Sequence, residues 1–334
     1  MAGKSSSSFR ESEPWSPCDA SRRDFLKGAT TVAAGLVAAP LASAVEAGTL
    51  PTVPLGKHRV SRLIVGSNPI RGYSHFNPQY NNHMVEWYTD ERAAQVLLDC
   101  QKAGINTFQS SYYQPRLLRH LELARKQGGA FQWICLTSAG DVIPQMKNQT
   151  AEWLRDGQFP AIEAAAKLNP IGMVHHGADT DFIVRAGKID YLKTYIDKVH
   201  DAGFPAGISV HTPATLEAIE SKNWGADFYM TCIYNLDRTR EEFKKEFGMV
   251  PVGETYLEED PPRMCAVIRK VNKPCLAYKI LAAGRKCNSP RVVRQAFEWI
   301  FKNIKPTDAV IVGMYPRYTD QITENTRTVR EICG

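Results

Sequence analysis

Three residues that could carry out acid–base or nucleophilic chemistry interrupt or end apolar stretches of this chain: Lys279, His176 and His211. Lys279 stands inside Cys275–Leu281, which is otherwise apolar. A lysine in such surroundings must either pair with an acid or face a polar cavity, where loss of water disfavours its charge and can prepare it as a base or a Schiff-base nucleophile. We therefore expect Lys279 to be catalytic; a salt bridge with a purely structural role is the alternative.

Two neighbouring apolar stretches end in histidines. His175 and His176 end the first of them, and His211 ends the next. Because side chains alternate along a strand, only one of the first two can face the interior. His176 and His211 could then lie close together and act as an acid–base pair or bind substrate. Asp179 or Glu254 could complete a site for a divalent metal, Zn²⁺ or Mn²⁺, and purely structural roles remain open.

The segment after the first apolar stretch is rich in amides, aromatic rings and charged groups. These groups suit a sugar or another polyol, because rings can stack and polar side chains can share hydroxyls. A polar loop with incidental aromatics is the alternative, and Arg285 further along could bind an anion or only cap a helix. The predicted substrate-binding residues are Asn68, His75, Glu86, Tyr113, Asn235, Glu254 and Arg285, and Tyr112 is a further catalytic candidate.

Short apolar stretches alternate with amphipathic helical segments. The apolar stretches lack a polar alternation, as strands covered on both faces do. Eight strand–helix units in about 270 residues predict an α/β fold, a (β/α)8 TIM barrel. A doubly wound sheet is the alternative, but its glycine-rich first turn is missing from Gly66–Pro69. The eight predicted strands are Arg62–Asn68, Thr107–Ser111, Trp133–Ala139, Ile171–Gly177, Ala206–Thr212, Phe228–Asn235, Cys275–Leu281 and Ala309–Tyr315.

The spacing of apolar residues predicts helices over Glu91–Ala103, Ile189–Ala202 and Ser289–Asn303. Three connections are unusually long, and the second of them is expected to contain a short helix. In a TIM barrel, long connections that follow strands lie on the catalytic face. The long connections are residues 69–89, 140–160 and 236–262.

The composition is that of an ordinary globular protein. The chain has 334 residues, a formal net charge of +6 and 43% hydrophobic residues. No run of Lys and Arg indicates nucleic acid or an anionic membrane surface as a partner. The eight cysteines show no CxxC pair or zinc-type spacing, and most are expected to be buried as small hydrophobes. A disulfide between Cys265 and Cys287 is left open.

The first 44 residues resemble a twin-arginine export signal. The motif Ser21–Lys27 is followed by a weakly apolar stretch, Gly28–Leu41, and by a small-residue cleavage site, Ala42–Ala44. The stretch is too short to span a bilayer, so no stable membrane anchor is expected. The twin-arginine translocation machinery carries folded proteins. We therefore expect a periplasmic or otherwise exported protein with one TIM-barrel domain over residues 45–334; a basic amphipathic N-terminus is the alternative.

Short motifs between residues 55 and 332 resemble the aldo/keto reductase family in order and spacing. The resemblance implies a (β/α)8 barrel, a reductase activity, a nicotinamide cofactor and a catalytic role for His176, which matches the family's histidine. The motifs are Leu55-Gly56-Lys57-His58-Arg59-Val60, Ala103-Gly104-Ile105-Asn106-Thr107-Phe108, His176-Gly177-Ala178-Asp179, Gly207-Ile208-Ser209, Tyr234-Asn235-Leu236, and Gly313 with Asp320-Gln321 and Glu324-Asn325.

The other members of the family's catalytic tetrad are not matched. Gln109 stands where the family has Asp, Gln114 where it has Tyr, and Thr137 where it has Lys. A tyrosine near its ordinary pKa of about 10 has little catalytic advantage at neutral pH, which argues against ordinary NAD(P)H reduction. By the same resemblance, the residues that would line a nucleotide pocket are Ser209, Arg317, Gln321, Glu324 and Asn325.

Three functions remain open at this point. The first is an exported, aldo/keto-reductase-like enzyme that acts on a carbonyl or sugar-type small molecule. The second is a cofactor-free or metal-dependent lyase, isomerase or hydrolase that uses Lys279 and His176. The third is a non-catalytic carbohydrate-binding barrel. Fold alone cannot choose among them.

Overall fold

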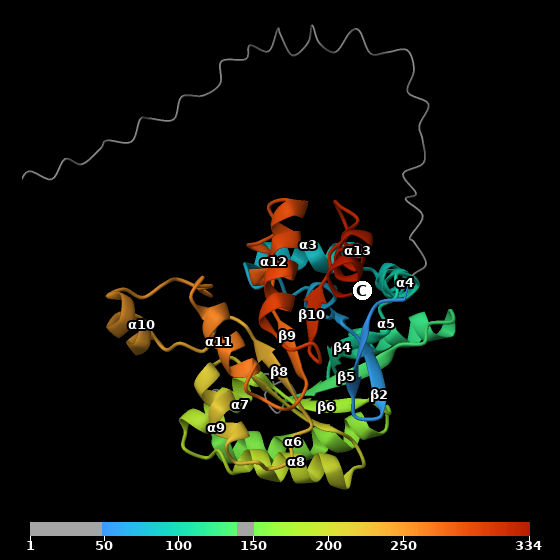
Figure 1. The fold of residues 1–334 in the computed structure, drawn as a ribbon. Coiled ribbons are helices and arrows are strands. Elements are labelled where there is room, and N and C mark those ends of the chain that lie inside the picture. The colour runs from blue at the N-terminus through green and yellow to red at the C-terminus, as the bar shows by residue number, and fades with distance from the viewer. Residues whose placement is uncertain (1–48, 139–149) are drawn as a thin grey trace, which may run out of the picture. The chain divides into compact units, whose positions relative to one another are not determined.

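The computed structural model describes residues 49–138 and 150–334, which belong to one compact unit, Val45–Gly334. The twin-arginine motif and its cleavage site lie outside the described residues. Eight parallel strands close into a barrel, and helices surround it (Figure 1). The predicted (β/α)8 TIM barrel is therefore confirmed.

The strands pair in the circular order β10-β3-β4-β5-β6-β7-β8-β9. All eight predicted strands are present, but most of the predictions run several residues too far at the carboxyl end. Some residues beyond the strand ends, such as Ile233, Ile280 and Met314, are apolar and buried because they pack in turns, not because they extend the sheet. The strands are β3 (Leu63–Gly66), β4 (Thr107–Ser111), β5 (Gln132–Thr137), β6 (Gly172–His175), β7 (Ala206–Val210), β8 (Phe228–Cys232), β9 (Cys275–Tyr278) and β10 (Ala309–Gly313).

Several of the helices begin where a side-chain oxygen accepts one of the first backbone N–H groups. Thr89 caps α4 and Ser289 caps α12, each by accepting a backbone N–H three residues on. These two helices and α8 confirm the three predicted helices. The helices of the described residues are α2 (Asn68–Arg71), α3 (Pro78–Trp87), α4 (Asp90–Lys102), α5 (Pro115–Lys126), α6 (Ala151–Ala166), α7 (Gly177–Arg185), α8 (Tyr191–Asp201), α9 (Pro213–Glu220), α10 (Arg240–Phe247), α11 (Asp260–Ile268), α12 (Pro290–Asn303) and α13 (Gln321–Cys333).

The long connections hold more helix than the sequence predicts. The first contains α3 and most of α2, and the third contains α10 and the start of α11. The helix expected in the second connection is not short, because α6 runs through Pro160 to Ala166. Residues 139–149 of that connection are outside the described part. The sequence did not indicate these helices because their exposed faces carry charged and amide side chains, which give the segments the composition of polar loops.

An antiparallel hairpin, β1 (Thr52–Leu55) and β2 (His58–Ser61), covers the amino end of the barrel. Val53, Leu55 and Val60 are buried and join the apolar side chains inside the barrel. Burying such a side chain stabilises the fold by about 1.5–3 kcal/mol. The hairpin turns at Gly56, whose φ of +56° is a left-handed value that glycine adopts without strain.

A buried ion pair also lies at the amino end. The Lys305 ammonium lies 2.9 Å from a carboxylate oxygen of Asp308 and donates to the Ile268 carbonyl oxygen at 2.8 Å. The Asp308 carboxylate is fully buried and accepts the Cys275 backbone N–H at 2.8 Å. Burial raises the pKa of Asp308, although Lys305 opposes the shift. Each charged group here thus has its partners.

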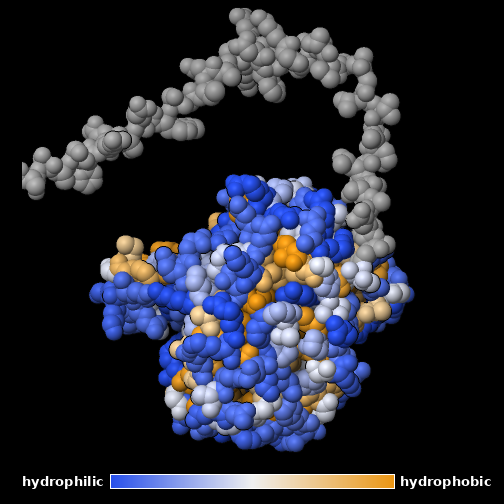
Figure 2. Space-filling view, in the orientation of Figure 1, coloured by the Kyte–Doolittle hydropathy of each residue, from blue (hydrophilic) through white to orange (hydrophobic). Residues whose placement is uncertain are grey.

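Helix α10 projects away from the barrel (Figure 1) and buries none of its residues. A capping box closes its start, since Thr239 and Glu242 bond to each other's backbone N–H groups. Figure 2 shows mostly hydrophilic residues on the face in view, with apolar ones also on this projection. None of the helices in the described ranges is both long enough and apolar enough to cross a membrane.

The cysteines in the described part are free thiols, and five of the seven are buried, as expected for small apolar side chains. The disulfide left open between Cys265 and Cys287 is not formed. Cys265 is buried while Cys287 is exposed.

Candidate active site

The carboxyl ends of the eight parallel strands meet at one end of the barrel, which we call the mouth. Several predicted site residues follow these ends within one or two residues. Asn68 comes after β3, His176 after β6, His211 after β7 and Lys279 after β9. The closed topology thus brings together residues that are far apart in the sequence.

Lys279 leaves β9 with a left-handed backbone, at φ 63°, and Ala282 and Ala283 have φ of 48° and 50°. Residues with a Cβ atom rarely adopt this conformation, which costs about 1–3 kcal/mol each and is commonest at functional sites. The half-buried Lys279 ammonium lies 5.3 Å from the centroid of the Tyr278 ring. Among the described residues it has no carboxylate partner within ion-pair distance, so the salt bridge considered as an alternative is not formed.

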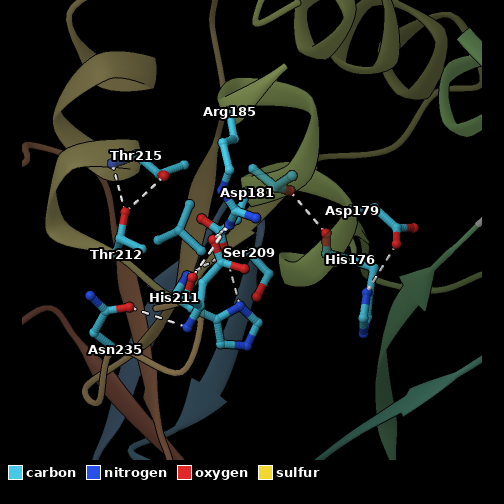
Figure 3. A network of polar contacts seen from close by, with 12 residues as sticks. His176, Asp179, Asp181, Arg185, Ser209, His211, Thr212, Thr215 and Asn235 are labelled. Carbon is cyan, nitrogen blue, oxygen red and sulfur yellow. Dashed lines mark hydrogen bonds and ion pairs between the residues drawn. The ribbon is translucent and has the colours of Figure 1, made fainter. Parts of the chain in front are cut away.

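His211 forms a pair with a buried aspartate (Figure 3). Its ring Nδ1 lies 2.9 Å from Asp181 Oδ2, and its backbone N–H donates to the same oxygen. This bond leaves Nε2 without a hydrogen-bond partner in the described structure. Burial lowers the pKa of His211; Asp181 opposes this shift, and the nearby charge of Lys279 adds to it. His211 is therefore a neutral imidazole at pH 7 with one nitrogen free to accept a proton.

The close fit of the His211 ring depends on Gly177, the first residue of α7. A Cβ atom at Gly177 would lie 2.7 Å from His211 Cε1 and 3.0 Å from Ser209 Oγ. Only glycine leaves room for both side chains. Gly177, which follows His176 in the sequence, is therefore needed because of the position of the His211 ring.

His176 pairs with a different aspartate (Figure 3). Its Nδ1 lies 3.5 Å from Asp179 Oδ1, and Asp179 also accepts hydrogen bonds from Ser138 and Gln158. Burial raises the pKa of Asp179, but the interactions with His176 and Ser138 outweigh it and the net shift is downward. The two histidines therefore face separate carboxylates. No group of three or more His, Cys, Asp or Glu within residues 49–138 and 150–334 is arranged to hold a metal ion.

His175 lies on the other side of its strand, as the alternation of side chains predicts. Its ring Nδ1 is 2.8 Å from Thr180 Oγ1, and its ring packs edge-on to Tyr195 of α8. Complete burial lowers the pKa of His175 to about 4. This histidine is therefore part of the layer between strands and helices, and not of the mouth.

A third histidine–carboxylate pair joins two long connections beside the mouth. His75 Nδ1 lies 2.8 Å from Glu254 Oε1, and Asn68 donates its amide to His75 Nε2 at 2.9 Å. The Tyr256 hydroxyl donates to Glu254 at 2.8 Å. Burial opposes ionisation of Glu254, but the bonds from His75 and Tyr256 and the charge of Lys279 lower its pKa to about 2. Both ring nitrogens of His75 are thus occupied, which favours a positioning role.

The other candidates from the sequence lie outside the three histidine–carboxylate pairs at and beside the mouth. Tyr112 and Tyr113 follow β4, with ring centroids 5.6 Å apart. The Asn235 side chain accepts the Asp237 backbone N–H and so shapes its own loop. Glu86 is on an exposed face of α3, where its charge acts on Arg317 and not on the histidine pairs. Arg285 lines a pocket next to the mouth, described below.

The residues predicted to bind a nucleotide lie in two separate parts of the structure. Ser209 is in β7, with its hydroxyl 3.2 Å from the Tyr278 hydroxyl. Gln321 and Asn325 are in α13, where Gln321 accepts the Tyr315 backbone N–H and Asn325 is buried. Arg317 is in the connection before α13 and is exposed over the Tyr318 ring. Glu324 lies in the first turn of the helix.

Sequence reasoning missed the groups that orient the candidates. Asp181 holds His211, Tyr278 bonds to Ser209, and Tyr256 holds Glu254. For Asp181 a partial signal was present, since it is an acidic residue early in α7, the helix that begins right after the strand-end His176. Nothing comparable marks the two tyrosines.

Comparison with solved structures supports the same fold. A putative aldo-keto reductase from Pseudomonas aeruginosa matches with a TM-score of 0.52 and 17% identity, covering 85% of this chain and 94% of that one. The apo form of Gox0644 matches with a TM-score of 0.50 and 10% identity, covering 85% and 94%. The glycerol dehydrogenase AKR11B4 from Gluconobacter oxydans matches with a TM-score of 0.48 and 13% identity, covering 85% and 96%. No protein-family model and no curated protein matches the chain.

The closed barrel and its match to the Pseudomonas aeruginosa structure show an aldo/keto-reductase-like (β/α)8 fold. At these identities the likeness concerns the fold, and the chemistry has to be argued from the residues at the mouth.

Proposed function

We propose that this barrel is an enzyme that acts on a small carbonyl or sugar-type molecule by acid–base chemistry at the mouth. The observation that carries the proposal is the unpaired Lys279 ammonium beside a His211–Asp181 pair with a free ring nitrogen. A non-catalytic sugar-binding barrel would have no need of a strained lysine next to a histidine poised as a base.

His211 is the proposed general base. Its Nδ1–H bond to Asp181 fixes the tautomer, so Nε2 presents a lone pair. Nε2 removes a proton from the carbon next to the substrate carbonyl, and the buried Asp181 carboxylate stabilises the imidazolium that forms. When the substrate is an α-hydroxy carbonyl compound, the proton of its hydroxyl moves to the carbonyl oxygen and the proton held on Nε2 returns to the former carbonyl carbon, which isomerises the substrate. His176 with Asp179 can serve as a second acid–base pair on the adjacent strand end.

Lys279 is proposed to stabilise the oxygen that becomes negative when the proton leaves. A preorganised cation in a half-buried site acts strongly on such a charge, because little water screens it. The lysine is near enough for its charge to lower the pKa of His75, His211 and Glu254. It therefore acts on the same small volume as the proposed base.

The residues present do not fit the nicotinamide nucleotide that the resemblance implies. The Thr137 hydroxyl bonds to Val174 and Tyr195 in the helix layer, so it cannot replace the lysine of the family tetrad. The Ser209 hydroxyl is bonded to Tyr278, and Asn325 is buried in α13. We therefore derive no hydride-transfer step.

Proton exchange tests the proposal without knowledge of the product. The full chain is incubated in D2O with a panel of aldoses, ketoses and their keto derivatives, and loss of the C–H signal next to the carbonyl is followed by NMR. We expect exchange with at least one class, lost in Lys279→Met and in His211→Asn. His200→Asn is the matched control, because His200 pairs with Asp227 far from the mouth. Absence of exchange across the panel, or turnover only with added NAD(P)H, overturns the proposal.

We also propose that the protein is exported through the twin-arginine pathway, on the strength of the Ser21–Lys27 motif. Replacing Arg22 and Arg23 together by lysine keeps the charge and removes the recognised pair. Cell fractionation should then find the protein retained in the cytoplasm at its full length. Unchanged export of the double variant would show that the motif is not a signal.

A further inference from the structure

An open pocket of about 560 Å³ lies between the start of α3 and the turn that follows Lys279. This volume suits one sugar ring with its substituents. The pocket is next to the mouth, since His75 immediately precedes its wall on one side and η1 (Ala282–Gly284) begins three residues after Lys279 on the other. Its lining residues are Phe76, Asn77, Gln79, Tyr80, His83, Ala283, Gly284 and Arg285.

Aromatic rings form one side of the pocket. Phe76 is 69% exposed and Tyr80 is 39% exposed, so both rings present apolar surface to solvent. Tyr80 stacks on His83 with centroids 5.9 Å apart, and Tyr315 and Tyr318 hydroxyls bond to the two ring nitrogens of His83. Such a fixed ring offers a flat face to the C–H groups of a pyranose.

Arg285 is the one permanently charged side chain that lines this pocket. Its guanidinium lies 4.3 Å from the Tyr256 ring centroid and 5.6 Å from that of Phe76. It donates to two backbone carbonyls, of Ala282 at 3.3 Å and of His75 at 3.4 Å, and has no carboxylate partner in the described part of the chain. A guanidinium has five N–H donors in a planar fork that matches a carboxylate.

The carboxylates near Arg285 already have partners. Glu254 accepts from Tyr256 and pairs with His75, and Glu258 pairs with Lys286 at 2.8 Å. The pocket therefore combines ring faces, amide groups and a cation with unused donors. A neutral sugar would use the rings and amides but leave the guanidinium unsatisfied.

We infer that this pocket binds a hexuronic acid ring, with its carboxylate on Arg285 and its C–H face on Phe76 and Tyr80. The ring attached to it would then reach Lys279 and His211. The substrate is accordingly a glycoside or oligosaccharide that contains a sugar acid. This inference rests on the proposed function, because it names the substrate of the same site, but the binding can be measured without turnover.

The test compares ligands that differ only in the carboxylate. Binding of methyl glucosiduronate and methyl galactosiduronate to the full chain is measured by titration calorimetry, each against its neutral methyl glycoside. We expect at least one acidic glycoside to bind about tenfold tighter than its neutral partner. Equal affinities in both pairs overturn the inference, as does acetate that competes as well as the uronate, since that would mean a simple anion site.

Variants separate the parts of the pocket. Arg285→Gln should remove the preference for the acid, and Arg285→Lys should keep part of it. Phe76→Ala should weaken both members of a pair about equally, and Arg327→Gln, an exposed arginine of α13, should change nothing. A preference that survives in Arg285→Gln overturns the inference. Binding is measured without turnover, so failure of the proposed chemistry (no proton exchange) and failure of this pocket (no preference for the acid) give different results.

Discussion

The two ends of the barrel differ in which residues adopt left-handed backbone conformations and in how a lysine is paired. At the amino end the left-handed positions include Gly56, Asn169 and Asn223, residue types that adopt positive φ at little cost, whereas at the mouth His75, Lys279, Ala282 and Ala283 have positive φ. At the hairpin end Lys305 has a carboxylate and a carbonyl as partners, whereas Lys279 has no carboxylate partner in the described structure. One end follows the rules that stabilise a fold, and the other departs from them. Departures gathered around one lysine are what the proposed chemistry at the mouth would require.

The largest expected effect comes from the lysine of the mouth. Lys279→Met should lower the rate of proton exchange by at least about 100-fold, because the cation that stabilises the oxyanion is lost. Its free energy of unfolding should stay within about 0.5 kcal/mol of the wild type, since no ion pair is broken. Exchange assays and urea denaturation on the same samples measure both. A large loss of stability would mean that Lys279 is structural.

The lysine of the hairpin end should behave in the reverse manner. Lys305→Met leaves the buried Asp308 carboxylate without its cation, which should lower the free energy of unfolding by about 3 kcal/mol. Exchange by the folded fraction should be unchanged. If urea denaturation finds no destabilisation, the contrast between the two lysines fails.

Substitutions at the left-handed positions of the two ends should change the free energy of unfolding by smaller amounts and in opposite directions. Ala283→Gly should raise the free energy of unfolding by about 1 kcal/mol, because glycine adopts φ 50° without strain. Gly56→Ala should lower it by about 1 kcal/mol for the same reason, since the space around Gly56 is open, with Pro205 Cγ at an ordinary 3.6 Å. Thermal unfolding of both variants checks the pair, and a stabilised Gly56→Ala would contradict it.

The smallest expected effect is the pH dependence of Glu254. Its pKa is about 2 in the folded protein, below the ordinary value of 4.5, so its ionised form stabilises the fold above pH 4.5. This contribution disappears as the pH falls from about 4.5 towards 2. Glu254→Gln should therefore be less stable than the wild type at pH 7, by under about 1 kcal/mol, and about equal to it near pH 2.5.

The control for this prediction is Glu86→Gln, an exposed glutamate of α3. Denaturation curves at several pH values should show the converging difference for Glu254 and none for Glu86. A difference that grows as the pH falls would show that the folded protein does not favour the ionised Glu254.

The sequence was a good guide to the strands and a poorer one to their ends. Continuous apolar stretches identified every barrel strand, because both faces of each strand are covered. The ends were misplaced because turns such as Ile280–Leu281 are apolar as well. The positions of His211 and Lys279 followed from the topology. The bond between His75 and Glu254 could not be predicted, since it joins residues 179 positions apart in two loops.

The bond between His75 and Glu254 also has a kinetic consequence. It links two loops beside Lys279, so a substrate of more than one ring has to pass or displace it. Lid openings take from about microseconds to seconds, a range that includes the roughly 0.1 s of a typical turnover. Under the proposed function, opening of this bond is therefore a step of substrate entry, and Glu254→Gln should make that step faster.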